Sequence, residues 1–229
     1  WTERDHHMIF FALSSDPNAS ARLHCDAHVC KLIVESAQML YTYLHFINVK
    51  IPPCRNASGK AAYAPTHAHH PCVLWLHGGR SHFAWLLNLG LALCREYTLR
   101  FGKVHATQAI LEHVAVQAPH IRLLDDCGPD AWLQRLADGG VPKHVLASCA
   151  AKVATVHPPD GCAFGVACIA DDVVPLVCDG HGRTDLVATT LEYYAHKCYF
   201  SVKMRWHRVA EPPLALKTAW GWDWDMDCA

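Results

Sequence analysis

The stretch CDAHVCKLIVESAQML, residues 25–40, is apolar around most of a helical circumference and predicts a core helix. Plotted at about 100° per residue, its polar side chains nevertheless fall within roughly a quarter turn of one another. We call these residues the polar stripe: His28, Lys31, Glu35 and Gln38. The apolar faces of this helix predict that other elements pack around it, and the polar stripe is the first candidate for a functional site.

Two interpretations of the polar stripe stay open. In the first, Lys31 and Glu35 form an i,i+4 ion pair with His28 at one end, which contributes only a few tenths of a kcal/mol on a surface. In the second, the stripe lines a cleft, because charged groups on a mostly buried helix are costly unless they are paired or face an opening. We favour the cleft, since the other faces are too apolar for a fully exposed helix.

Start and stop signals elsewhere predict an all-α class, a compact helical domain with an irregular insertion and few or no strands. Asp16 followed by Pro17 provides an N-cap and a proline in the first turn. We expect Ser81 to cap a long helix that ends at Gly102. The expected helices are 17–24, 26–46, 71 to about 78, 81–102, 106–116 and 184–206.

The 229 residues are enough for a single domain with a sizeable core, and 52% hydrophobic against 18% charged residues is a globular balance. We expect an insertion at 117–157 and a Trp-rich C-terminal tail at 214–229. The longest apolar runs fall short of the ~20 residues of a membrane span. A net charge of −1 excludes a protein that grips nucleic acid through overall basic charge, so any nucleic-acid site must be local.

The sequence holds twelve cysteines and no CxxC pair. We interpret most of them as free thiols, which places the protein in an intracellular reducing compartment such as the nucleus, an organelle or a virus-associated site. A zinc site is a weaker alternative, because cysteine and histidine can form a tetrahedral ligand set if two segments meet in space. Its ligands would come from Cys25, His28, His67, His70 and Cys72.

A family resemblance is carried by five blocks of the sequence, together with Trp75 and Trp206: DAHVCKLIVE (26–35), THAHHPC (66–72), LGLALCREYTLRFGKVH (89–105), PDG (159–161) and EYYAHK (192–197). Together they resemble a family of small phage and large-virus proteins. That family is similar in turn to the pyrimidine-dimer DNA glycosylases of the endonuclease V type. The resemblance implies a DNA glycosylase and AP lyase that cleaves a base-sugar bond in damaged or modified DNA, with DNA, or else RNA, as its partner.

Carried over residue by residue, the resemblance makes Glu35 the catalytic acid/base and His28 a neighbour that positions the damaged strand or its sugar. The glycosylases use a free N-terminal amine as the nucleophile that forms an imine with the sugar. Here Met8 corresponds to the start of the family and WTERDHH precedes it, so that amine is absent unless processing exposes it. Lys31 could replace it if burial favours its neutral form. At the position of Gln38 the glycosylases have an arginine, so the resemblance implies a weaker grip on DNA at this face.

We expect His70 to line the same cleft. Further cations are candidate phosphate contacts for nucleic-acid binding: Arg95, Arg100, Lys103, Lys197, Lys203 and Arg205. A second hypothesis keeps the glycosylase-like fold but not its activity, and makes the protein a structural subunit of a larger assembly with protein partners. The near-zero net charge, the expected insertion and the aromatic tail favour this alternative.

Overall fold

The computed structural model describes residues 12–167 and 176–201, with side chains given up to residue 194. It confirms the all-α class, because helices make up most of the described chain and the strands form a single two-residue pair there. The elements are α1 (Pro17–Leu23), α2 (Asp26–Phe46), α3 (Pro71–Trp75), the 3₁₀ helix η1 (Leu76–Gly78), α4 (Arg80–Phe101), α5 (Gln108–Gln117), the 3₁₀ helix η2 (Ala118–His120), α6 (Pro129–Asp138), α7 (Lys143–Ala151), β1 (Val153–Ala154), β2 (Gly165–Val166) and α8 (Leu186–Ser201).

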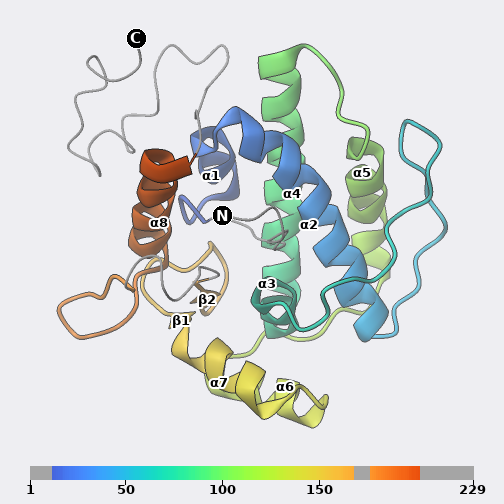
Figure 1. Cartoon of the computed structure of the whole chain (residues 1–229). Coiled ribbons are helices and arrows are strands. Elements are labelled where there is room, and N and C mark those ends of the chain that lie inside the picture. The colour runs from blue at the N-terminus through green and yellow to red at the C-terminus, as the bar shows by residue number, and fades with distance from the viewer. Residues whose placement is uncertain (1–11, 168–175, 202–229) are drawn as a thin grey trace, which may run out of the picture.

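The two long helices α2 and α4 cross at the centre of the molecule, with α5 beside them and α8 on the opposite side (Figure 1). Leu32, Ile33 and Leu40 of α2 are almost completely buried. The two helices approach closely at Gly90 of α4, where an added Cβ would lie 3.2 Å from the Cβ of Ser36. Small residues at this point allow α2 and α4 to bury their apolar faces against each other.

Local signals set most helix ends. The Asp16 carboxylate accepts a hydrogen bond at 2.6 Å from a first-turn amide of α1, as expected of an N-cap. Gly102 ends α4 in the left-handed conformation, with φ of 65°. The expectation that Ser81 caps α4 is wrong. Its amide and hydroxyl instead donate to the carboxylate of Asp126, at 2.8 and 2.9 Å, so this cap comes from a distant loop.

Residues 117–157, which we expected to be irregular, contain α6 and α7 and contribute to the core. Trp132 of α6 is fully buried, and its indole N–H donates to the carbonyl of Leu74 at 2.8 Å. The short β1 then pairs antiparallel with β2, in the register Val153 to Val166. The segment is therefore folded against the α3 end of the domain (Figure 1).

Among the described residues, none of the helices combines the length and the apolar character that crossing a membrane demands. The predicted tail at 214–229 and the Met8 region lie outside the described residues.

Candidate functional site

The polar stripe of α2 contains a close ion pair. The Lys31 Nζ lies 3.2 Å from the Glu35 Oε1. The Glu35 side chain is only 8% exposed, whereas the Lys31 side chain is 45% exposed. The predicted i,i+4 pair therefore forms, but its carboxylate is withdrawn into the protein and its ammonium faces outward. This arrangement lies between an open catalytic cleft and a closed internal ion pair.

The loop that precedes α3 is tied to α2 one turn beyond Gln38. The Thr42 hydroxyl accepts a hydrogen bond from the Thr66 amide at 3.1 Å and donates to the carbonyl of Gln38 at 2.7 Å. Four residues later, His70 caps the N-terminus of α3, where its Nδ1 accepts from the Cys72 amide at 3.2 Å. The loop thus brings His70 to the same side of α2 as the polar stripe.

His70 is half-buried and responds to the charge of Glu35. Burial by itself lowers the pKa of His70, but the Cys72 thiol and the Glu35 carboxylate outweigh it, so the pKa is raised. Lys31 and Glu35 are thus in contact, and His70 lies within electrostatic reach of Glu35, so three groups that can hold a proton occur in one region. This is the set that we take as the candidate site.

His28 lies at the other end of the polar stripe and contacts a residue from α8. Its Nδ1 is 2.9 Å from the Tyr194 hydroxyl, and the same hydroxyl accepts from the Cys25 amide at 2.7 Å. His28 is 9% exposed and Tyr194 is fully buried. Since His28 and Glu35 are seven residues apart, they are separated by about 10 Å along the helix axis. His28 therefore belongs to the stripe but not to the immediate surroundings of the carboxylate.

Arg100, a candidate phosphate contact, is instead part of the interior. Its guanidinium is within hydrogen-bonding distance of the carboxylates of Asp26 and Glu96 at 3.3 and 3.0 Å, and donates to the carbonyl of His24 at 2.6 Å. The Arg100 side chain has no exposed surface. An arginine that is buried and bonded in this way is not available to a nucleic-acid phosphate, so we exclude it from the candidate site.

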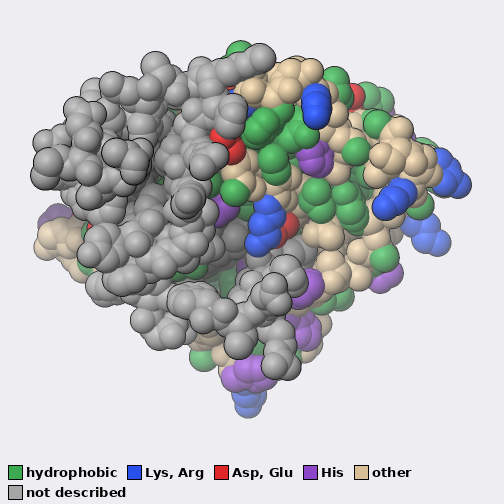
Figure 2. Space-filling view, turned by 45° about the horizontal axis from the view of Figure 1, so that its top comes forward, with side chains coloured by type: hydrophobic (Ala, Val, Ile, Leu, Met, Phe, Trp, Pro, Cys, Tyr) green, Lys and Arg blue, Asp and Glu red, His purple; other side chains and the backbone are tan. Residues whose placement is uncertain are grey.

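The other candidate cations are dispersed. Arg95 is exposed and donates to the Asn18 side chain at 2.6 Å, and Lys103 is exposed just beyond α4. The Lys197 side chain, Lys203 and Arg205 lie outside the described residues. On the described part of the face in Figure 2, lysine and arginine side chains occur singly or in small groups among neutral and hydrophobic ones. That distribution agrees with a net charge of −1.

The predicted zinc ligands have other contacts. The His67 Nδ1 is 2.7 Å from the Thr66 hydroxyl, and the His70 Nδ1 accepts from the Cys72 amide at 3.2 Å. Over residues 12–167 and 176–194, no three His, Cys, Asp or Glu side chains converge in a way that could hold a metal ion. The cysteines described there are free thiols. The zinc site stays a prediction without an assembled set of ligands.

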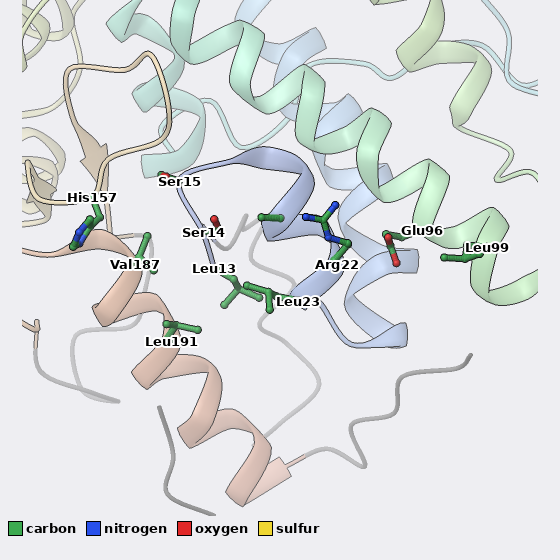
Figure 3. Close-up of a pocket in the computed structure, with 11 residues that line it drawn as sticks. Leu13, Ser14, Ser15, Arg22, Leu23, Glu96, Leu99, His157, Val187 and Leu191 are labelled. Carbon is green, nitrogen blue, oxygen red and sulfur yellow. The ribbon is translucent and has the colours of Figure 1, made fainter. Parts of the chain in front are cut away.

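A cavity of about 700 Å³ lies away from the polar stripe (Figure 3). It is bounded by the segment before α1, by α1, by the end of α4 and by α8. Its apolar lining comes from Leu13, Leu23, Leu99, Val187 and Leu191, and Arg22, Glu96 and His157 add charge or polarity. None of the polar-stripe residues lines it. The cavity and the ionisable groups of the candidate site therefore lie in different parts of the described chain.

No protein-family model, no curated protein and no solved structure matches this chain.

Sequence reasoning missed the structural roles of two residues that shape this part of the molecule. Tyr194 is part of the EYYAHK block, yet nothing in its spacing connects it to α2 across more than 160 residues. For Arg100 a local signal was available, because Glu96 stands four residues before it and marks an i,i+4 partner.

Proposed function

We propose that this chain is a nucleic-acid-processing protein of the glycosylase and lyase type, with its chemistry centred on Lys31 and Glu35. The observation that carries the proposal is the 3.2 Å contact between a half-exposed amine and a nearly buried carboxylate on the polar stripe. Both groups lie in the DAHVCKLIVE block, whose resemblance to the viral family implies a catalytic carboxylate at Glu35.

In this proposal Lys31 supplies the amine that the N-terminus supplies in the glycosylases. A lysine must lose a proton before it can attack the C1′ carbon of a sugar. Lys31 is 45% exposed and pairs with a carboxylate, so attack requires a neighbouring base to take up its proton. The Glu35 carboxylate is within hydrogen-bonding distance and can accept it.

On an abasic sugar the neutral Nζ would add to the aldehyde carbon, and loss of water would give an imine. Glu35 would return its proton to the departing hydroxyl, so one group acts first as base and then as acid. His70, which responds electrostatically to Glu35, is placed to adjust the charge of this pair. DNA is the expected partner, with RNA as the alternative.

Borohydride trapping tests this proposal directly. Borohydride reduces an imine to a stable amine, so a duplex containing an abasic site or a pyrimidine dimer should become covalently attached to the full chain. We expect Lys31→Ala to abolish the adduct, and Glu35→Gln to slow its formation by about 100-fold, the contribution typical of a general acid/base. The adduct should map to the peptide that contains Lys31.

Lys143→Ala is the matched control, because Lys143 is an exposed lysine at the start of α7, away from the polar stripe. It should leave trapping unchanged. An adduct that persists in Lys31→Ala would exclude Lys31 as the nucleophile.

A second candidate function is a structural subunit that keeps the fold without activity. It is favoured by the same ion pair, because the positive charge of Lys31 is already balanced by a carboxylate 3.2 Å away, without any substrate. In this case no duplex gives an adduct, and the Lys31→Ala chain still assembles with its protein partners. Measuring trapping and assembly on the same variants separates the two functions.

A further inference from the structure

We propose that the cavity between α1, α4 and α8 binds a small amphiphilic molecule, a monocarboxylate with a long apolar chain, whose carboxylate contacts Arg22. The cavity measures about 700 Å³. This volume falls in the range of about 300–1,000 Å³ that is typical of small-molecule sites in proteins. The inference is independent of the proposed function, because none of the polar-stripe residues lines the cavity.

Two helix faces form the apolar wall of the cavity (Figure 3). Val187 and Leu191 are four residues apart on α8, and Ala19 and Leu23 have the same spacing on α1, so each pair shares one face of its helix. Leu13, from the segment before α1, adds to this wall. An apolar chain that lies against these side chains is removed from water, which favours binding.

The charged groups that line the cavity differ in whether they already have a partner. The Glu96 Oε2 accepts from the Nε and Nη2 of Arg100, at 3.1 and 3.0 Å. The His157 Nδ1 lies 2.7 Å from a carboxylate oxygen of Asp185. The Arg22 carbonyl accepts from Arg100 at 3.1 Å, but the Arg22 guanidinium has no ion-pair partner among the described residues. The charge left without a partner in the cavity is therefore positive.

An unpaired guanidinium selects the head group of the ligand. Its planar fork of N–H donors matches the two oxygens of a carboxylate. Figure 3 shows Arg22 and Glu96 toward the α4 side of the cavity and His157 at the opposite side. Because His157 is paired with Asp185, that opposite side offers no unpaired cation for a second carboxylate. The arrangement therefore fits one anionic head at Arg22, with the apolar chain between α1 and α8.

Isothermal titration of the full chain with three probes tests the two parts of the ligand. Decanoate has both the head group and the chain, decanol has the same chain without the charge, and acetate has the head group alone. We expect decanoate to bind about tenfold more tightly than decanol, the contribution of one charge-assisted hydrogen-bonded contact. Acetate should show no binding, because it buries no apolar surface.

Arg22→Gln tests the head-group contact. It should weaken the binding of decanoate by about tenfold and leave that of decanol unchanged, since only decanoate carries the charge. Arg95→Gln is the matched control. Arg95 is an exposed arginine of α4 that also contacts α1, through the Asn18 side chain at 2.6 Å, but it does not line the cavity. This variant should bind both probes as the wild type does.

Ala19→Met tests the place of binding. Methionine is a good helix former, and the backbone amide at this position keeps its 2.6 Å hydrogen bond to the Asp16 carboxylate. The longer side chain takes up part of the cavity, so a variant with wild-type circular dichroism should lose binding of both decanoate and decanol.

Three outcomes would overturn the inference: no binding of decanoate to the wild type, equal binding of decanoate to the wild type and Arg22→Gln, or unchanged binding in Ala19→Met. Borohydride trapping at Lys31 is a separate measurement, so failure of the cavity ligand and failure of the proposed function are distinguishable.

Discussion

Two i,i+4 ion pairs, one on α4 and one on α2, differ in which partner is buried. In the pair on α4, Arg100 has no exposed surface and Glu96 is 12% exposed. In the pair on α2, Glu35 is 8% exposed and Lys31 is 45% exposed. The two pairs have the same spacing in sequence but different roles. On α4 the buried cation is a structural anchor, whereas on α2 only the carboxylate is buried and the amine can be reached from solvent.

The surroundings of the two pairs reinforce this difference. Arg100 also binds Asp26 and the carbonyls of Arg22 and His24, so it connects α1, α2 and α4. Lys31 has an outward-facing side chain beside Glu35. Removing the buried cation should therefore damage folding, whereas removing the exposed one should mainly affect chemistry.

The largest effect is expected from Arg100→Met. Removing one partner of a buried ion cluster leaves uncompensated charges, which typically costs about 3–5 kcal/mol of the free energy of unfolding. Urea denaturation at neutral pH measures this loss. Arg95→Met, also on α4 but exposed, should change stability by no more than about 0.5 kcal/mol. Equal effects from the two variants would contradict the assignment of Arg100 as an anchor.

The next effect is acid destabilisation through His24, which lies in the same cluster. Burial, opposed by a hydrogen bond to Ser20 and assisted by Arg100, lowers the pKa of His24 from 6.5 to about 3. As the pH falls, His24 is therefore protonated in the unfolded chain before it is protonated in the folded protein. The free energy of unfolding is highest above pH 6.5 and decreases below it. Each pH unit below 6.5 removes about 1.4 kcal/mol.

Urea denaturation between pH 7 and pH 5 checks this slope. His77 and His82, whose pKa values burial lowers to about 4, add to the slope in the same direction. His24→Gln should reduce the slope by the contribution of one histidine. A variant with the same slope as the wild type would show that His24 is protonated in the folded state.

A smaller effect is expected from Lys31→Met. An i,i+4 pair with an exposed lysine contributes about 0.5 kcal/mol, so the free energy of unfolding should decrease only slightly. The same urea measurement made for Arg100→Met provides the comparison. A loss as large as that of Arg100→Met would mean that Lys31 has an anchoring role, and would favour the structural-subunit alternative.

The smallest effect concerns His70. Its pKa is raised, with Glu35 as one of the causes, whereas the pKa of His24 is lowered. Glu35→Gln should therefore lower the pKa of His70 and leave that of His24 unchanged. NMR titration of the histidine ring protons reads both groups in one sample. Equal shifts of the two histidines would indicate a general change of fold instead of a local interaction.

The sequence predicted the helices well because their signals are local. The cap at Asp16, the stop at Gly102 and the apolar period of α2 depend on residues within a few turns of one another. The Ser81 prediction failed because the partner that caps α4, Asp126, is 45 residues away. Residues 117–157 were expected to be irregular for a similar reason. The position of α6 depends on the hydrogen bond from Trp132 to Leu74, which lies 58 residues earlier in the chain.

For the candidate site too, local sequence patterns determined some features and tertiary contacts determined the others. The sequence by itself determined the polar stripe, because a helical period fixes which side chains share a face. Only the tertiary structure decided that Glu35 is buried while Lys31 is not, and that Arg100 belongs to the interior. It also brought Tyr194 to His28. Contacts between distant segments depend on how apolar faces pack, and no local pattern in the sequence records that outcome.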